Sequence, residues 1–236
     1  MRSSSRNRPV TKIAAVAGAV VASVALVALP ASAKSSKSSS LVGTFGVTAA
    51  SCASGAPTSG SYFRMVQSGG TTTAGPFVPN ADSTCGDKTY SALQPGTAGG
   101  LTTGKYQPDP SPAFDSAGNG LAAAIVAPTK FFGVNFAVST NATDPQTKTS
   151  TKKPSIKVSG KKLTGDLDAV SVAYGNQQFN QGAPKPDGST PTGTAGPTGT
   201  YDAKTGKYTL DWSSAIIGGP FSGFTGIWHL EGTFKK

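Results

Sequence analysis

The sequence predicts an all-β protein, folded as a single-domain antiparallel β-sandwich or barrel of about ten strands after a cleaved N-terminal signal peptide. Turn-forming residues are abundant, since 30 Gly and 17 Pro make up about a fifth of the 236 residues, where average usage is roughly 12%. Short runs that alternate apolar and polar residues recur between Gly-rich segments, which is the pattern of half-buried strands. The chain has a single Glu, and this composition excludes a coiled coil or a helical bundle.

The first 33 residues have the parts of a secretory signal peptide. Four basic residues precede an apolar segment over residues 13–29, and Ala31-Ser32-Ala33 supplies the small residues of a cleavage site. A membrane anchor is the alternative, but 17 residues fall short of the roughly 20 needed to span a bilayer. We therefore expect residues 1–33 to be removed and no transmembrane anchor to remain. The protein is then secreted, either free outside the cell or loosely associated with the cell wall.

Cys52 and Cys85 are the two cysteines of the chain. In an exported protein, two cysteines are expected to form one structural disulfide. A redox pair is the alternative, but redox cysteines are usually spaced as C-x-x-C. The sequence therefore predicts a Cys52–Cys85 bridge.

The mature chain is expected to begin with a flexible polar leader and to continue as one β domain. The leader, residues 34–40, contains no apolar residue, and the domain covers residues 41–236. In the first part of the domain, Gly- and Pro-rich turns separate strands expected at residues 41–48, 61–67, 88–93, 121–126 and 131–138.

The last third of the chain has the most regular pattern. A hairpin is expected over residues 155–158 and 162–174, and a second over residues 200–202 and 207–212. Residues 175–199 have no apolar periodicity and are expected to form a long connection. A final strand is expected at residues 224–234. Its LEGTF segment repeats the L-x-G-T-F pattern of residues 41–45, which fits a sheet whose first and last strands pair.

His229 and Glu231 form the first candidate site, because they are the only His and the only Glu in the chain. Residues two apart in a strand face the same side, so both side chains are expected on one face. An imidazole beside a carboxylate can serve as a general base with an orienting partner, or can bind a small ligand. A polar pair on the outer face of a strand is the alternative.

The loop around Asn176 and Phe179 is the second candidate site. Its neutral amides and aromatic ring are the groups with which a protein surface binds a glycan. Trp and Tyr residues in the neighbouring strands are expected to be in the core instead.

A Lys-rich stretch is the third candidate site. Without the signal peptide, the 21 basic residues fall to 17 against 11 acidic ones, so the mature net charge is +6. Much of this excess lies in residues 148–162, which contain no acidic residue and can meet a polyanion. The lysines concerned are Lys152, Lys153, Lys157, Lys161 and Lys162. Arg64 is the single Arg after residue 33, and a nucleic acid is therefore not the expected partner.

These observations favour a secreted, non-enzymatic binding or envelope-associated protein, whose partner is a cell-wall glycan or polyanion. The sequence contains no recognisable nucleophile motif, metal-ligand set or phosphate-binding loop, so no cofactor is expected. A small-ligand-binding protein or a hydrolase centred on His229 and Glu231 is one alternative. A structural surface component without a specific ligand is the other.

Overall fold

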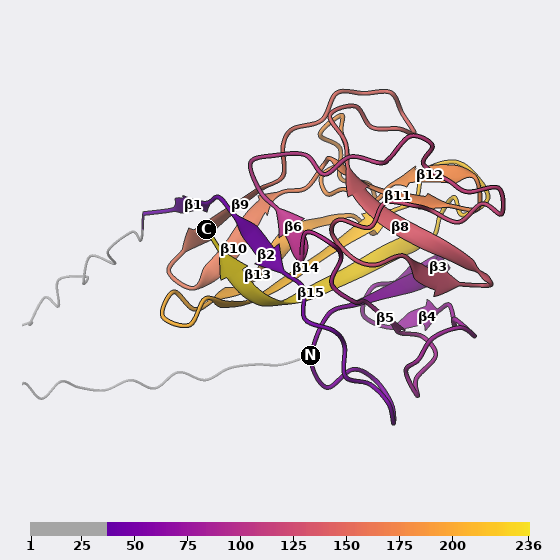
Figure 1. Cartoon of the computed structure of the whole chain (residues 1–236), viewed down its shortest axis with the longest axis horizontal. Coiled ribbons are helices and arrows are strands. Elements are labelled where there is room, and N and C mark those ends of the chain that lie inside the picture. Colours follow the sequence, from indigo (N-terminus) through magenta and orange to yellow (C-terminus); the bar gives the residue numbers. More distant parts are fainter. Residues whose placement is uncertain (1–36) are drawn as a thin grey trace, which may run out of the picture. The chain divides into compact units, whose positions relative to one another are not determined.

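The computed structural model describes residues 37–236, so the predicted signal peptide and the beginning of the leader lie outside the described residues. The described chain is all-β, as predicted, and contains fifteen strands (Figure 1). Several have only two or three residues, which is why they outnumber the ten expected. The strands are β1 (Ser39–Leu41), β2 (Thr44–Gly46), β3 (Tyr62–Thr71), β4 (Gly75–Phe77), β5 (Ser91–Ala92), β6 (Gly100–Thr102), β7 (Thr129–Phe131), β8 (Val134–Thr140), β9 (Ser155–Ser159), β10 (Lys162–Asp166), β11 (Val170–Tyr174), β12 (Gln177–Asn180), β13 (Ala195–Tyr201), β14 (Lys207–Ala215) and β15 (Thr225–Lys235).

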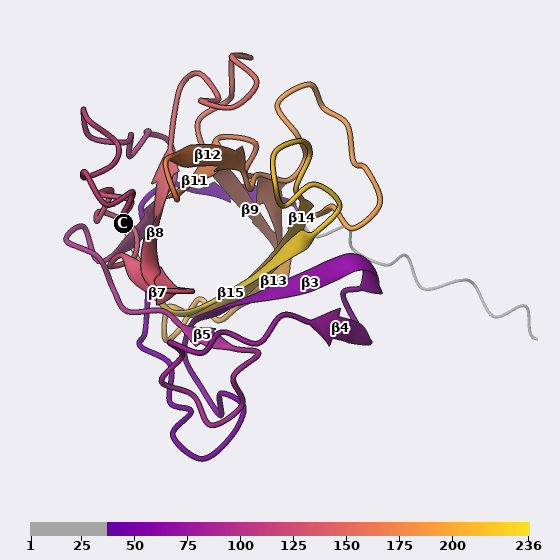
Figure 2. The ribbon, with the colours of Figure 1, turned by 90° about the vertical axis from the view of Figure 1, so that its right-hand side faces the viewer.

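The strands form two antiparallel sheets. The larger has eleven strands, with the order β1-β9-β10-β13-β14-β15-β2-β6, and β3 pairs with β15 beside β2 and carries β4 and β5. The smaller has four strands in the order β12-β11-β8-β7. The large sheet is curled, and the strands of both sheets surround one core (Figure 2).

The strand β15 is the centre of the large sheet. One of its edges pairs with β14 from Thr225 to Thr233, and the other pairs with β3 and then with β2. In the second pairing, Phe234 lies opposite Phe45, and their ring centroids are 4.8 Å apart. These are the phenylalanines of the two L-x-G-T-F segments, so the pairing predicted from that repeat is confirmed.

Alternation along β14 and β15 divides the large sheet into a buried face and an outer face. Leu210 and Trp212 of β14 and Trp228 of β15 are buried, and the two indole rings stack with centroids 5.7 Å apart. Each indole N–H is satisfied by Gln181, through its main-chain oxygen for Trp212 and its side-chain oxygen for Trp228. Both tryptophans therefore belong to the core, as their strand pattern predicts.

The predicted disulfide is present between Cys52 and Cys85. Cys85 is fully buried and Cys52 is nearly so. The bond connects a segment after β2 to the turn-rich segment before β5.

Some predicted elements have different boundaries in the structure. Ser39 and Ser40, assigned to the leader, pair with β9 as part of β1. The strand expected at residues 131–138 is a hairpin, because Phe132 and Gly133 take φ values of 48° and 82° and turn the chain between β7 and β8. The strand expected at residues 162–174 is split between the two sheets as β10 and β11. Residues 121–126 form a single β-bridge at Val126 rather than a strand.

The connection expected over residues 175–199 contains all of β12 and the start of β13. The sequence of β12 shows no apolar alternation because its last residue, Asn180, is polar and is nevertheless buried. The Asn180 side-chain amide donates to the side chain of Asp144 and to the main-chain oxygen of Asp168, both at 3.0 Å. A buried polar strand end of this kind leaves no hydrophobic period in the sequence.

Candidate functional site

The outer face of the large sheet carries a row of polar side chains that crosses six strands. The register places Asp211 of β14 opposite His229 of β15, and His229 opposite Tyr62 of β3. In the other direction the row continues through Thr198, Thr164 and Lys157. Because facing residues of paired strands project to the same side, these six side chains share one surface.

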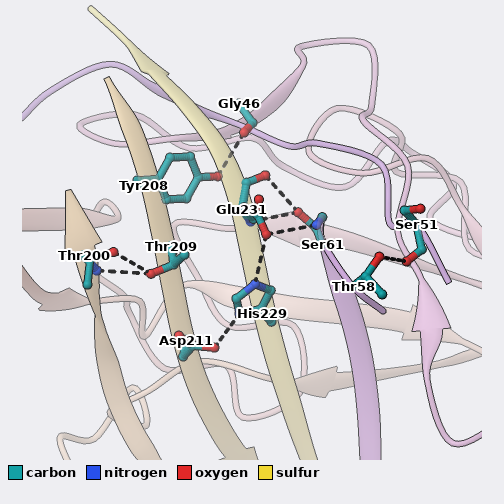
Figure 3. Close-up of polar contacts among 11 residues, drawn as sticks. Gly46, Ser51, Thr58, Ser61, Thr200, Tyr208, Thr209, Asp211, His229 and Glu231 are labelled. Atoms are coloured by element: carbon teal, nitrogen blue, oxygen red, sulfur yellow. Dashed lines mark hydrogen bonds and ion pairs between the residues drawn. The ribbon is translucent and has the colours of Figure 1, made fainter. Parts of the chain in front are cut away.

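His229 is held on this surface by three neighbours, two of which, Asp211 and Glu231, are drawn in Figure 3. Its Nδ1 lies 2.6 Å from Oδ1 of Asp211, and its Nε2 lies 3.8 Å from Oε2 of Glu231. The ring stacks on Tyr62, with centroids 4.7 Å apart and planes 17° apart. The imidazole therefore has a carboxylate on each side and an aromatic ring on one face, and its side chain is only 16% exposed.

Glu231 has one carboxylate oxygen that is engaged by the fold. Its Oε2 accepts the main-chain N–H of Gly60 at 2.9 Å. Ser61 follows Gly60 in the chain. Its hydroxyl group donates a hydrogen bond to the main-chain oxygen of Glu231 and accepts one from the main-chain N–H of Glu231. Ser61 is fully buried and its hydroxyl is therefore committed to the backbone rather than to His229. In the described part of the chain, no hydroxyl group hydrogen-bonds His229, so the arrangement has a base and an orienting carboxylate without a nucleophile.

A groove of about 570 Å³ lies next to Glu231 on the same face. Its walls carry hydroxyl groups, two carboxylates and two ammonium groups, contributed by β13, β14, β15 and the turns beside them. Two of the hydroxyls, on Thr200 and Thr209, hydrogen-bond each other at 2.9 Å (Figure 3). The lining residues are Thr48, Lys161, Thr200, Tyr201, Asp202, Lys207, Tyr208, Thr209, Glu231, Gly232 and Thr233.

The structure divides the Lys-rich stretch. Lys157 and Lys162 are exposed on the outer face, in the same cross-strand rows as His229 and Glu231 respectively. Four strand spacings separate Lys157 from His229, which is about 19 Å along the sheet. Lys161 lines the groove itself. The sequence therefore identified two sets of residues that share one surface, although it gave no reason to join them.

The other two lysines are placed differently. Lys152 pairs with Asp166 at 3.0 Å, and the hydrogen bond and charge of this carboxylate raise the pKa of the ammonium group. The Lys-rich stretch contains no acidic residue, but Asp166 of β10 lies next to Lys152 in the folded protein. Lys153 is exposed in the loop before β9.

The loop around Asn176 and Phe179 does not form the surface expected of a glycan site. Asn176 is exposed at the turn between β11 and β12, where its φ is 60°. Phe179 is 4% exposed, and its ring packs against Phe221, with centroids 5.8 Å apart. It is unavailable to a surface ligand because β12 turns this side chain toward the core.

Asp211, Tyr62 and the groove threonines are the residues that sequence reasoning missed. Asp211 lies on the outer face of β14, but its position opposite His229 depends on the register between β14 and β15. The loop that sets this register, residues 216–224, has no regular pattern. A two-residue hairpin turn would have fixed the register in the sequence, and the connection between these two strands is longer.

Among residues 37–236, no group of three or more His, Cys, Asp or Glu side chains is arranged to hold a metal ion. The same residues include no helix with the length and hydrophobicity needed to cross a bilayer. Comparison of the chain with protein-family models, with curated proteins and with solved structures finds no match.

Proposed function

We propose that this protein is a secreted, non-enzymatic binding protein that holds a glycan or an anionic cell-wall polymer on the outer face of its large sheet. The groove beside Glu231 is the observation that carries the proposal. It is about 570 Å³ in volume, which is within the range of ligand sites. Its walls are rich in hydroxyl and charged groups, whereas a site for an apolar ligand has mostly hydrophobic walls.

The groups in the groove match the hydrogen-bonding needs of a sugar. A carboxylate such as Glu231 or Asp202 accepts hydrogen bonds from ligand hydroxyls, and threonine hydroxyls both donate and accept. Glu231 has only one of its oxygens bonded within the fold, so the other is available to a ligand. Lys161 and Lys207 add positive charge at the groove, which favours a ligand that carries carboxylate or phosphate groups.

Lys157 and Lys162 extend the positive charge beyond the groove on the same surface. A polymer bound at Glu231 and running across the strands would reach them. In this proposal, the groove recognises one sugar unit of the polymer. Lys157 and Lys162 bind the anionic groups that repeat along it.

The test is binding of the mature protein to a glycan array, purified cell wall and teichoic acid. Thr209→Val removes a groove hydroxyl while it keeps the side-chain shape, and we expect at least a tenfold loss of affinity for the ligand found. Thr73→Val makes the same change at an exposed threonine between β3 and β4, whose hydroxyl also pairs with that of another threonine but lies outside the groove, and this variant should bind like the wild type. A wild-type protein that binds none of these ligands would overturn the proposal.

The contact between Asp211 and His229 favours a second candidate, in which the histidine acts as a base in a small-ligand site or a hydrolase. A histidine whose Nδ1 is held by a carboxylate presents Nε2 to a ligand or to a water molecule. His229→Gln distinguishes the two candidates. Loss of a hydrolytic activity with glycan binding retained would support the second one, and unchanged behaviour in both assays would remove His229 from either site.

A further inference from the structure

A cavity of about 30 Å³ lies in the core between the two sheets, on the opposite side of the large sheet from the groove. Its walls are mainly aromatic and come from both sheets. Six of the residues that line it are Phe63, Phe131, Phe136, Phe179, Phe221 and Trp228. Phe63 and Trp228 pack with their ring centroids 4.5 Å apart, and Phe63 and Phe136 with theirs 5.3 Å apart.

The polar groups at this cavity are already hydrogen-bonded. Gln181 accepts from the indole N–H of Trp228 at 3.1 Å and donates its own amide to the oxygen of Asn180, also at 3.1 Å. The hydroxyl of Tyr174 donates to the main-chain oxygen of Phe131 at 2.8 Å. Cavities that offer no free polar partner stay dry and accept apolar molecules. A ligand for this cavity must therefore be apolar.

The loop between β14 and β15, residues 216–224, closes one side of the cavity with Phe221. Phe221 is half-buried, and its ring lies against those of Tyr174 and Phe179, with centroids 5.9 and 5.8 Å away. Of the aromatic rings that line the cavity, this is the one supplied by an irregular loop instead of a strand or a hairpin end. It occupies the position that the ring of a ligand would take.

Most hydrogen bonds of this loop are made within the loop itself. The N–H of Ile216 donates to Phe224 and the N–H of Gly223 donates back to Ile216, at 2.7 and 3.0 Å. From the rest of the described chain, the loop receives one hydrogen bond, from the side-chain amide of Gln146 to the oxygen of Ile217 at 2.5 Å. Movement of the loop therefore gives up one hydrogen bond, the ring contacts of Phe221 and the buried position of Ile216.

Apolar side chains are also exposed beside the cavity. Ile217 is 54% exposed and Phe132 is 52% exposed, and the Phe132 ring packs on that of Phe131 in the cavity wall, with centroids 4.9 Å apart. An exposed Phe at a position with φ of 48° is uncommon for a bulky residue. Phe132 therefore places apolar surface next to the cavity wall, whereas Ile217 lines a separate pocket with Gln146 and Asn180.

We propose that this cavity is a second binding site, which takes a single aromatic ring when the loop over residues 216–224 moves and Phe221 leaves. The ligand class is a small aromatic compound or the phenyl group of a larger one. The site is independent of the glycan groove, because the two lie on opposite faces of β15. Either one can fail while the other stands.

The test uses toluene as the probe and amide chemical shifts of the mature protein as the readout. In the wild type we expect saturable shifts at residues around Phe136 and Trp228 and along the loop. Phe221→Ala should raise the affinity for toluene at least tenfold, because it removes the competing ring and enlarges a dry cavity. Val172→Phe, which fills the cavity from β11, should abolish saturable binding.

Ile217→Ala is the matched control. It shortens an exposed apolar side chain of the same loop that does not line the cavity, so affinity should stay within about twofold of the wild type. Absence of saturable shifts in both the wild type and Phe221→Ala would overturn the proposal. An equal gain in Phe221→Ala and Ile217→Ala would overturn it too, because toluene would then be responding to a loosened loop.

Discussion

Asp211 and His229 face each other across β14 and β15, with a carboxylate oxygen of one 2.6 Å from Nδ1 of the other. An ionised carboxylate can only accept a hydrogen bond, so the proton of the neutral imidazole must lie on Nδ1. The same ring is stacked on Tyr62. The orientation and the tautomer of the only histidine are thus both set by residues from neighbouring strands.

We therefore predict that neutral His229 is the Nδ1–H tautomer. Asp211→Ala should remove this preference and produce a mixture of tautomers, because the hydrogen-bond partner determines which nitrogen is protonated. Imidazole ¹⁵N chemical shifts, recorded at a pH where the ring is neutral, measure the populations. Asp202→Ala, which removes a groove carboxylate without a contact to His229, is the control. An Nε2–H tautomer in the wild type would contradict the assignment.

Removal of the disulfide should destabilise the fold. The bond between Cys52 and Cys85 closes a loop with a sequence separation of 33, and the chain-entropy relation gives about 3.8 kcal/mol for a loop of this length. The double variant Cys52→Ser, Cys85→Ser should lose a similar amount of unfolding free energy in urea titrations. Reduction of the wild type should have the same effect. A loss below about 1 kcal/mol would show that the reduced chain is already constrained in this region.

The pairing of Phe45 with Phe234 should be a major source of stability. Phe45 is fully buried and contacts the rings of both Phe234 and Tyr208. Phe45→Ala should therefore lower the free energy of unfolding by about 3–5 kcal/mol, the usual cost of this change in a core. Phe132→Ala, at an exposed ring, should cost far less. Equal losses in urea titrations of the two variants would refute the claim that the buried ring contacts of Phe45 are a major source of stability.

Asp168 should make the folded state less stable as the pH rises from 4 to 6. Burial, with a smaller contribution from the charge of Asp166, raises the pKa of this carboxyl group from 3.8 to about 6. As the pH rises through this window, the unfolded chain releases its proton first, so the folded state is progressively disfavoured. Asp168→Asn keeps an acceptor for the N–H of Lys152 and should lack this fall.

The measurement is urea unfolding of the wild type and Asp168→Asn at several pH values. The gap in unfolding free energy should grow in favour of the Asn variant from pH 4 to pH 6 and stay constant above it. Asp187→Asn, at an exposed carboxylate whose pKa is lowered by Ser189, should not reproduce this trend. A gap that does not change with pH would contradict the raised pKa.

Lys185 should have the opposite effect at alkaline pH, where it makes the free energy of unfolding increase with pH. The residue is 6% exposed, its ammonium group donates to the hydroxyl of Ser214 at 2.6 Å, and burial lowers its pKa from 10.5 to about 8. Between these two values the unfolded chain holds the proton that the folded chain has released, so stability rises with pH. Lys185→Met should lose this rise in thermal or urea unfolding between pH 8 and pH 10, whereas Lys153→Met should keep it.

The regular strands of this fold could be predicted because their inner and outer residues alternate. In β14 and β15, that alternation places the tryptophans on the face opposite to His229 and Glu231. The repeated L-x-G-T-F pattern fitted a sheet whose first and last strands pair, and its two segments do meet where β2 pairs with β15. The two cysteines predicted the disulfide by elimination. Each of these inferences depends on a short-range pattern or on the scarcity of a residue type.

The parts that could not be predicted depend on register and on buried polar groups. Asp211 becomes a partner of His229 only through the pairing of β14 with β15. Lys152 meets Asp166 across a loop and a hairpin, and β12 is buried partly through hydrogen bonds of Asn180. At the β7–β8 turn, Phe132 adopts a left-handed conformation that usually requires Gly. The apolar alternation of residues 131–138 therefore gave no sign of a turn there.

The placement of β15 between strands from both ends of the described chain has a consequence for the order of folding. Residues 225–235 are synthesised after the strands that they join, since they pair with β2 and β3 as well as with β14. Until they leave the ribosome, the edges of β2 and β3 that face β15 have no partner, and Trp228 is missing from the core. Contacts between residues so distant in sequence also slow folding. The large sheet should therefore stay incomplete until β15 is available, and then form in one cooperative step.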